Sequence, residues 1–513
     1  MVVSMVGKSR LHNTVRNMSW HMIYQVIVMT LGVILPKYII SVYGSEVNGL
    51  TSTIKHVLTL VTIVQAGLGT SATYLMYKPL EENDKVRIAS ILKSIKKVYR
   101  IIAFVVAGIG FVASAILAFT VEGSIGEKYI FIASFITCID SSLSLYFTAA
   151  CNLFLNAKQD KYVISIVTMI TGVLNYGIQI IILLLKPTFL FLYFNNMFIC
   201  ILNIVILVIV FGKKYEPYKL TKEEQKAVKT VPIPGVTYAA MNEASHAAVY
   251  GMITVVVSIM GSLTAASVLS VYMMVINLIS TVSTVAYSSF VPSYGSLVAE
   301  GNMEKTNRIF EIFQFTFFSL MTFLFMCTTV LIVPFVKIYT AGITDAEYVN
   351  ELLMILCVVY GMFYAFRIPY NNTVSVTGLF EETSKQPMIC AVLAVALMFA
   401  LTGINYALVM IGPVFFYVAN TFYQHFALKK LFRGFQNDHF WRHFAVAMAG
   451  FLIALSLYHI VPISAVSFGD WILYAVATTA VCGVILLVLL VMLDGSSLKL
   501  TYNFFKMNIL PKK

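Results

Sequence analysis

The sequence predicts an all-α polytopic membrane protein with 14 transmembrane helices, and three observations lead to this fold class. Hydrophobic residues make up 59% of the 513 residues and charged residues only 11%, too few to give a soluble domain its polar surface. The apolar residues fall into fourteen segments, each close to the roughly 20 residues that a helix needs to cross a bilayer. The basic residues avoid every second gap between these segments.

The predicted spans follow one another almost without interruption. They centre on residues 18–41, 50–74, 100–119, 130–150, 163–185, 188–211, 236–260, 264–291, 310–336, 352–376, 387–402, 404–427, 443–461 and 468–493. The division between the eleventh and twelfth spans rests on Gly403. Several gaps are tight turns, such as residues 186–188 and 261–263, and none is long enough to fold into a separate domain.

The distribution of basic residues predicts the orientation of the helices. If the N-terminus is cytoplasmic, 29 of the 35 Lys and Arg residues lie in the inward gaps and tails. The outward gaps hold only Lys128 and Lys186, together with six acidic residues. Positive-inside sorting therefore places both termini in the cytoplasm, and the even number of helices agrees. The net charge of +12 reflects insertion and contact with an anionic inner leaflet, so no nucleic-acid partner is expected.

The remaining sequence features exclude other classes of protein. There is no Walker-type glycine loop. The seven cysteines lie in or beside spans without close pairs, which indicates packing residues and neither a disulfide framework nor a metal site. Any function must therefore be carried among the helices, which favours a secondary transporter over a membrane enzyme or an ATP-driven pump. We expect no cofactor, apart from H⁺ or Na⁺ as a coupling ion.

A weak internal repeat predicts two bundles. Asp84-Lys85 recurs as Glu304-Lys305, 220 residues later, and Lys161 recurs as Lys385, 224 residues later. Two six-helix bundles in parallel orientation are expected from such a repeat. The predicted divisions are an N-terminal six-helix lobe (1–211), a cytoplasmic basic linker (212–231), a C-terminal six-helix lobe (232–427), and two additional helices with a cytoplasmic tail (428–513).

Short motifs occur in a characteristic order along this frame. They are YGSEVNGL at 43–50, AGLG at 66–69, YKPL at 77–80, IYTAG at 338–342 and RIPYNN at 367–372. In these motifs the chain resembles the Wzx-like polysaccharide flippases of the MOP/MATE-like superfamily, and the resemblance covers nearly its whole length.

The resemblance implies a function in surface polysaccharide biosynthesis. Such proteins export undecaprenyl-diphosphate-linked oligosaccharide from the inner to the outer leaflet of a bacterial cytoplasmic membrane by alternating access. The implied partners are the lipid-linked oligosaccharide, membrane lipids and a polysaccharide polymerase or other assembly proteins. Lipid II flippases, which are relatives, carry an arginine pair shortly before the glycine of the second helix. This chain has Leu60 and Val61 there, which disfavours a peptidoglycan precursor as substrate.

Arg367 is the best candidate for contact with a diphosphate. It lies near the middle of the tenth predicted span, where Tyr360, Tyr364 and Asn371 share its face at helical spacing. Charges inside a membrane are costly and usually face a cavity, and a planar guanidinium suits a phosphate pair. Pro369 would loosen the backbone locally. The alternative is a structural role, in which Arg367 pairs with an acid or with freed backbone carbonyls.

The second span carries a polar stripe that could form another wall of the cavity. Lys55 lies near its predicted outer end, and the stripe continues through Thr59, Thr62 and Gln65. Lys37 in the first span is a further candidate cation. The alternative is that Lys55 reaches to the membrane interface and that the hydroxyls hold neighbouring helices together.

Two acids within spans are candidates for ion coupling. Asp140 lies in the middle of the fourth span, and Glu243 shares a face with His246 in the seventh. A carboxylate near a histidine could carry a proton, and carboxylate oxygens could hold Na⁺. Alternatively, both acids neutralise Arg367 or a lysine.

Two other functions remain open. A MATE-like cation-coupled multidrug exporter would favour acidic cavity residues for cationic drugs, and twelve helices would suffice for it. A membrane glycosyl polymerase or acyltransferase would usually display a large outward loop or a catalytic His or Asp constellation. The short outward gaps argue against the second of these.

Overall fold

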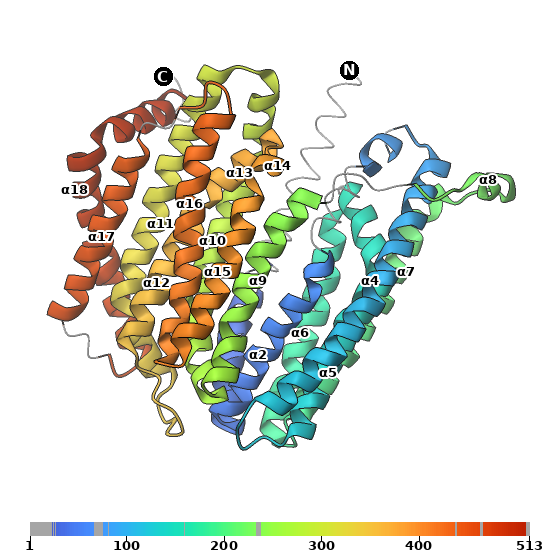
Figure 1. Cartoon of the computed structure of the whole chain (residues 1–513), viewed down its shortest axis with the longest axis horizontal. Helices are drawn as coiled ribbons and strands as arrows, with labels where there is room; N and C mark the ends of the chain where they lie inside the picture. The colour runs from blue at the N-terminus through green and yellow to red at the C-terminus, as the bar shows by residue number, and fades with distance from the viewer. Residues whose placement is uncertain are drawn as a thin grey trace. The chain divides into compact units, whose positions relative to one another are not determined.

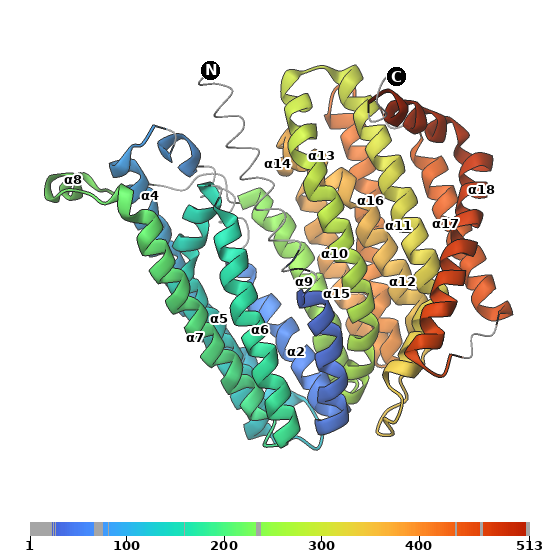
Figure 2. The ribbon, with the colours of Figure 1, turned by 180° about the vertical axis from the view of Figure 1, so that it is seen from behind.

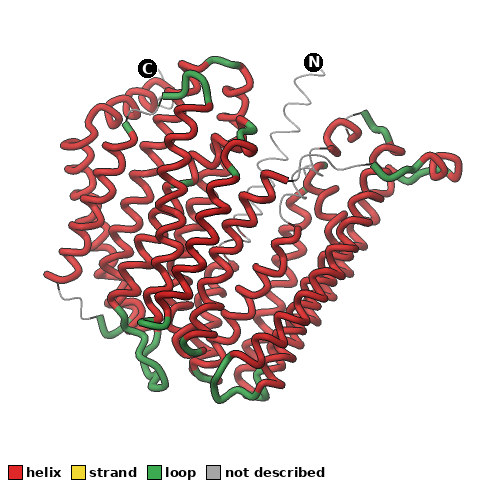
Figure 3. Tube along the Cα trace, viewed as in Figure 1, coloured by secondary structure: helices red, strands yellow, loops and turns green. Residues whose placement is uncertain are grey.

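The computed structural model describes residues 23, 25, 27–65, 75–80, 82–158, 160–231, 237–436, 439–461 and 465–508. Within these ranges the chain consists of helices and connecting loops, without a strand (Figure 3). Twelve helices are long and apolar enough to cross a membrane, so the prediction of an all-α multi-pass protein is confirmed.

The first two predicted spans are the ones not among these twelve. The described part of the first is Ile27–Tyr43, a shorter apolar helix. The second begins as α2 (Ser45–Val61), which has 17 residues and gives way to the 3₁₀ turn η1 (Thr62–Gln65). The motif at 66–69 lies outside the described residues. The count of 14 therefore stays a prediction.

The helices belong to two compact units, Met1–Ser267 and Val268–Lys513. The boundary falls inside α10 (Leu263–Glu300). These units are defined by compact packing, whereas the predicted lobes 1–211 and 232–427 were defined by an internal repeat. The predicted lobes therefore stay a prediction.

The first unit is built from antiparallel helices (Figures 1 and 2). After α2 and η1 they are α4 (Lys85–Thr120), α5 (Glu127–Ala157), α6 (Lys161–Leu185), α7 (Leu190–Tyr215), η2 (Glu216–Tyr218), α8 (Lys222–Ala227) and α9 (Thr237–Met260). α4 packs on α5, while α7 packs on both α5 and α6. Local sequence starts two of these helices: the Asp84 side chain accepts from the Arg87 amide, and Thr221 forms a capping box with Glu224. The hydrogen bonds from Thr221 hold the pKa of Glu224 below its usual range.

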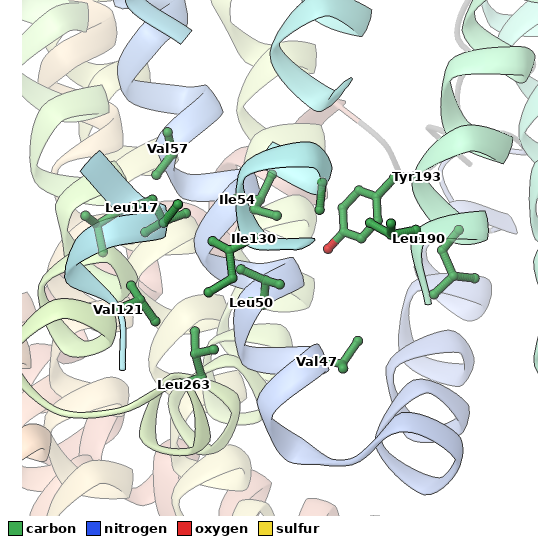
Figure 4. Close-up of a cluster of buried hydrophobic side chains, with 14 of the residues drawn as sticks. Val47, Leu50, Ile54, Val57, Leu117, Val121, Ile130, Leu190, Tyr193 and Leu263 are labelled. Atoms are coloured by element: carbon green, nitrogen blue, oxygen red, sulfur yellow. The ribbon is translucent and has the colours of Figure 1, made fainter. Parts of the chain in front are cut away.

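An apolar cluster around α2 forms one core of this unit (Figure 4). On α2, Val47, Leu50, Ile54 and Val57 recur every three or four residues, which places them on one helix face. Gly49 lies against the start of α10, where an added Cβ would be 1.8 Å from the Leu263 carbonyl oxygen. Only glycine permits this approach. The other members labelled in Figure 4 come from α4, α5, α7, the start of α10 and the residue after α4: Leu117, Val121, Ile130, Leu190, Tyr193 and Leu263.

The second unit repeats the packing order of the first. Its remaining helices are α11 (Met303–Tyr339), α12 (Glu351–Phe366), α13 (Ile368–Thr377), α14 (Phe380–Thr383), α15 (Lys385–Thr402), η3 (Tyr406–Met410), α16 (Ile411–Leu431), α17 (Phe440–Ile460) and α18 (Phe468–Asn508). α15 ends beside Gly403, as predicted. α11 packs on α12, and α16 packs on α12 and α15, which matches the pairing of α4, α5, α6 and α7. Asn302 caps α11 through the Lys305 amide as Asp84 caps α4, two residues away from the Glu304 that the sequence repeat aligned with Asp84.

The last two helices are an addition to this pattern. α17 and α18 pack on each other and on α11. α18 is kinked at Asp494, whose backbone angles (φ −143°, ψ 39°) are not helical.

Candidate functional site

Arg367 occupies a break in the helix that contains it. α12 ends at Phe366 and α13 begins at Ile368, with Pro369 in its first turn. Proline has no amide hydrogen and cannot continue the helical hydrogen bonds of the preceding turn, so the predicted loosening at Pro369 is present. Arg367 is the seventeenth residue of the apolar stretch Glu351–Thr377 and therefore lies at depth within a span.

Two tyrosine rings lie against the Arg367 guanidinium and a third packs on both of them; Arg367 is only 7% exposed. Its Cζ lies 5.8 Å from the ring centroid of Tyr364 and 5.5 Å from that of Tyr417. The Tyr417 ring centroid is 5.3 Å from that of Tyr364 and 5.4 Å from that of Tyr360. The predicted grouping of Tyr360, Tyr364 and Arg367 is therefore observed, and α16 adds Tyr417. We call these four residues the tyrosine–arginine cage. Cation–π contacts of a desolvated guanidinium are each worth about 1–2 kcal/mol.

Asn371 lies one turn beyond the cage. The backbone amide of Asn371 donates to the Arg367 carbonyl at 3.0 Å, and the Asn371 side chain is half-buried. Further side-chain amides are buried in the same unit, and no local sequence pattern singles them out. Several of their side-chain atoms have no hydrogen-bond partner within the described ranges: Gln314 Oε1, Asn372 Nδ2, Asn420 Oδ1 and Gln424 Oε1. Water or a hydroxyl-rich ligand would satisfy such atoms.

Lys55 lies within α2, ten residues and about 15 Å after its first residue, Ser45. Its predicted position near the outer end of a span stays a prediction. The helix begins five residues before the predicted span 50–74, within the polar run at 43–50. Asn48 in that run is buried in the helix and donates to the Ser267 hydroxyl at 2.8 Å. Lys55 itself is exposed.

The polar side chains that follow Lys55 lie in α2 and η1, and the hydroxyls of Thr59 and Thr62 donate to backbone carbonyls of α2. Thr59 donates to the Lys55 carbonyl at 3.1 Å, and Thr62 donates to the Leu58 carbonyl at 2.9 Å. Their oxygens still have lone pairs that could accept from a ligand. Gln65 is half-buried at the end of η1.

The predicted acids differ in burial. Glu243 is exposed, whereas Asn242 and His246 are buried, and the coupling role of Glu243 stays a prediction. α9 packs on α2, where the Tyr250 carbonyl accepts from Nδ1 of His56 at 2.9 Å.

Asp140 and Lys37 occupy separate places in the first unit. Asp140 is half-buried on α5, and its buried Oδ1 accepts no hydrogen bond from the described residues. The Cys200 thiol donates to the Asp140 backbone carbonyl at 3.5 Å. Lys37 is half-buried within Ile27–Tyr43. Over the described ranges, no hydrogen bond or ion pair joins Asp140 to Lys55 or His246.

A buried charge cluster at the kink of α18 was not predicted. Asp494 Oδ2 lies 2.9 Å from His443 Nε2, and Asp494 Oδ1 lies 3.8 Å from His439 Nδ1. His439 Nε2 is in turn 3.3 Å from Glu311 Oε1. We call these four residues the His–Asp cluster; it joins α11, α17 and α18. The described residues contain no group of His, Cys, Asp and Glu able to hold a metal ion. The distances in the cluster are those of ion pairs when the histidines are protonated.

Comparison with known proteins identifies the fold. No protein-family model matches the sequence, and no curated protein does. Among solved structures, an inward-facing multidrug resistance MATE family transporter of the MOP superfamily matches with a TM-score of 0.60 and 13% identity, over 81% of this chain and 99% of that chain. The lipid II flippase MurJ in an inward closed conformation matches with a TM-score of 0.59 and 13% identity, over 96% of this chain and 99% of that chain. A MATE protein in complex with MaL6 matches with a TM-score of 0.56 and 14% identity, over 82% of this chain and 97% of that chain.

These likenesses concern the fold alone. Because the MurJ match covers 96% of this chain, it extends into the C-terminal helices α17 and α18. The chain therefore has the fold shared by the MATE transporters of the MOP superfamily and MurJ.

Proposed function

We propose that this protein moves an undecaprenyl-diphosphate-linked oligosaccharide from the inner to the outer leaflet of the cytoplasmic membrane by alternating access. The fold is one used by exporters and by a lipid flippase, which supports transport as the general activity. The sequence motifs that resemble Wzx-like flippases support an oligosaccharide on a polyprenyl carrier as the substrate.

The tyrosine–arginine cage is the observation that carries this proposal. A guanidinium stays charged at every physiological pH, and burying it in a span costs at least about 2.5–3.5 kcal/mol. Its planar fork of donors matches a diphosphate, while tyrosine rings and hydroxyls suit sugar faces and sugar hydroxyls. A cationic drug would be repelled by Arg367, so the cage favours an anionic substrate over a MATE-like drug.

Lys55 supports the same substrate class. It is a second cation within α2, and it is exposed on the first unit. A dianionic headgroup leaving a negative cell interior gains about 2.3 kcal/mol per charge per 100 mV. Export could therefore run on the membrane potential. For H⁺ or Na⁺ coupling, Asp140 and, separately, Glu243 with His246 remain our proposals.

Flipping in proteoliposomes tests the proposal. The substrate is a fluorescent undecaprenyl-diphosphate oligosaccharide, and the fraction in the outer leaflet is measured with a membrane-impermeant quencher. We expect Arg367→Ala to reduce the rate at least tenfold and Arg367→Lys to retain part of it. Arg308→Ala, which removes an exposed arginine of the same unit, is the matched control and should flip at the wild-type rate. Wild-type flipping by folded Arg367→Ala would overturn the proposal.

The same vesicles separate the competing functions. A cation-coupled drug exporter would move cationic dyes and leave the lipid-linked oligosaccharide in place. A glycosyl polymerase or acyltransferase would change the mass of the oligosaccharide. We expect neither dye movement nor a change of mass.

A further inference from the structure

A basic cavity lies in the first unit, apart from Lys55 and the other predicted site residues. Its volume is about 680 Å³, within the roughly 300–1,000 Å³ typical of small-molecule sites. Four cations of α4 line it: Lys93, Lys96, Lys97 and Arg100. Their spacing of three, four and seven residues from Lys93 places them on one helix face.

Three parts of the chain build the walls of this cavity. α7 contributes Phe211 and Tyr215 opposite the cations. The segment after α8 is fastened across α4 by two hydrogen bonds, from Lys93 Nζ to the Val228 carbonyl (3.2 Å) and from the Val231 amide to Ser94 Oγ (2.7 Å). This segment places Thr230 in the lining. The cavity is therefore a built feature of the fold and not a chance gap between mobile lysines.

The positive charge of the cavity is not neutralised locally. In the part of the chain that the structure describes, no acidic side chain lies within ion-pair distance of the four cations. Arg100 is held in place by Tyr146, whose ring centroid is 5.1 Å from the Arg100 Cζ. Four like charges on one face repel one another, so an anion bound there would relieve the repulsion.

The apolar surface next to the cavity identifies the type of anion. Ile101 lines the cavity and is 58% exposed, and Phe104 on the next turn is 72% exposed. Ile101 follows Arg100 directly and Phe104 lies about one helical turn from it, both in the helix Lys85–Thr120, which is long and apolar enough to span a membrane. A free phosphate would use only the charges, whereas a lipid would use the charges for its headgroup and the apolar face for its acyl chains.

We propose that this cavity binds the phosphate headgroup of an anionic phospholipid from the leaflet at the basic end of α4. The acyl chains lie along the exposed face that begins with Ile101 and Phe104. The site is separate from the proposed substrate path, so the inference does not depend on flipping activity.

Native mass spectrometry of the purified full-length protein tests the proposal. Phosphatidylglycerol is titrated against phosphatidylcholine, and the affinity of the first lipid bound is measured. We expect clear selectivity for phosphatidylglycerol, and at least tenfold weaker binding by the variant K93Q/K96Q/K97Q/R100Q. The control K213Q/K219Q/K222Q/K226Q removes four basic residues of the same unit outside the cavity and should bind within twofold of wild type. Equal binding of the two lipids, or equal losses in the two variants, would refute the site.

Two further arms keep the test decisive. Tight binding of glycerophosphate alone would show a free-phosphate site, and binding of undecaprenyl diphosphate without phosphatidylglycerol would show a substrate site; either overturns the proposal. If the quadruple variant misfolds, amine labelling of the wild-type protein replaces it. Phosphatidylglycerol vesicles should protect Lys96 and Lys97 but not Lys222, relative to phosphatidylcholine vesicles, and equal labelling would contradict the proposal.

Discussion

His443→Ala should destabilise the second unit strongly, because it leaves the buried carboxylate of Asp494 without its closest basic partner. Asp494 and His443 are both almost fully inaccessible, and Asp494 Oδ2 lies 2.9 Å from His443 Nε2. For a protonated histidine and an effective dielectric constant of about 20, that separation corresponds to a gross attraction of roughly 6 kcal/mol. Without His443, the nearest basic group to Asp494 is His439, at 3.8 Å. Breaking a buried pair from one side costs about 3–5 kcal/mol, and we expect a loss of this size.

The partner substitution should be milder. Asp494→Asn keeps the volume and removes the charge, and His443 can then remain neutral, so we expect a loss of about 1–2 kcal/mol. The double variant His443→Ala/Asp494→Asn contains no carboxylate at position 494, so no buried charge is left without a partner. Its cost should therefore fall below the sum of the single costs by about 1–3 kcal/mol.

Unfolding by SDS in mixed micelles measures these free energies. Trp441 on α17 and Trp471 on α18 are fluorescent reporters on the two helices that the cluster joins. His459→Ala, an exposed histidine on α17, is the control and should change stability by less than about 0.5 kcal/mol. The reasoning is refuted if His443→Ala costs no more than His459→Ala, or if the single costs simply add.

Three further substitutions test other parts of the account. Gly49→Ala would bring a Cβ to 1.8 Å from the Leu263 carbonyl oxygen, so SDS unfolding should show a loss of at least about 1–3 kcal/mol in the free energy of unfolding. Gly108 has open space around it, so the control Gly108→Ala should be neutral or slightly stabilising. Lys55→Ala should slow flipping of the fluorescent lipid about tenfold and Lys55→Arg much less, and an unchanged rate in Lys55→Ala would remove this residue from the substrate path. Asp140→Asn should leave unfolding by SDS within about 1 kcal/mol of wild type and abolish any stimulation of flipping by an imposed pH gradient; persistent stimulation would exclude Asp140 as the proton carrier.

Features local to one helix were predictable from the sequence. A guanidinium in an apolar stretch stands out because its burial is costly, and helical spacing then places Tyr364 beside Arg367 and Tyr360 on the same face. Proline at 369 predicted the local loosening, and glycine at 403 predicted a helix end. These inferences need only the geometry of a single helix.

Features that depend on contacts between helices were not predictable. Tyr417 reaches Arg367 from α16, and Asp494 meets His443 across 51 residues of chain. Neither pair has a local pattern in the sequence. The exposure of Glu243 likewise depends on how α9 packs against other helices, which helical spacing alone did not settle.

Photocrosslinking from the cage tests the central claim most directly. Tyr417 is replaced by benzoylphenylalanine, and the membrane-embedded protein is irradiated with radiolabelled undecaprenyl-diphosphate oligosaccharide. We predict labelling that excess unlabelled substrate suppresses and that Arg367→Ala abolishes. Benzoylphenylalanine at Phe426, an exposed position on the same helix, should give only labelling that excess substrate does not suppress. Equal, unsuppressed labelling at both positions would contradict the claim that Arg367 and its tyrosines receive the headgroup.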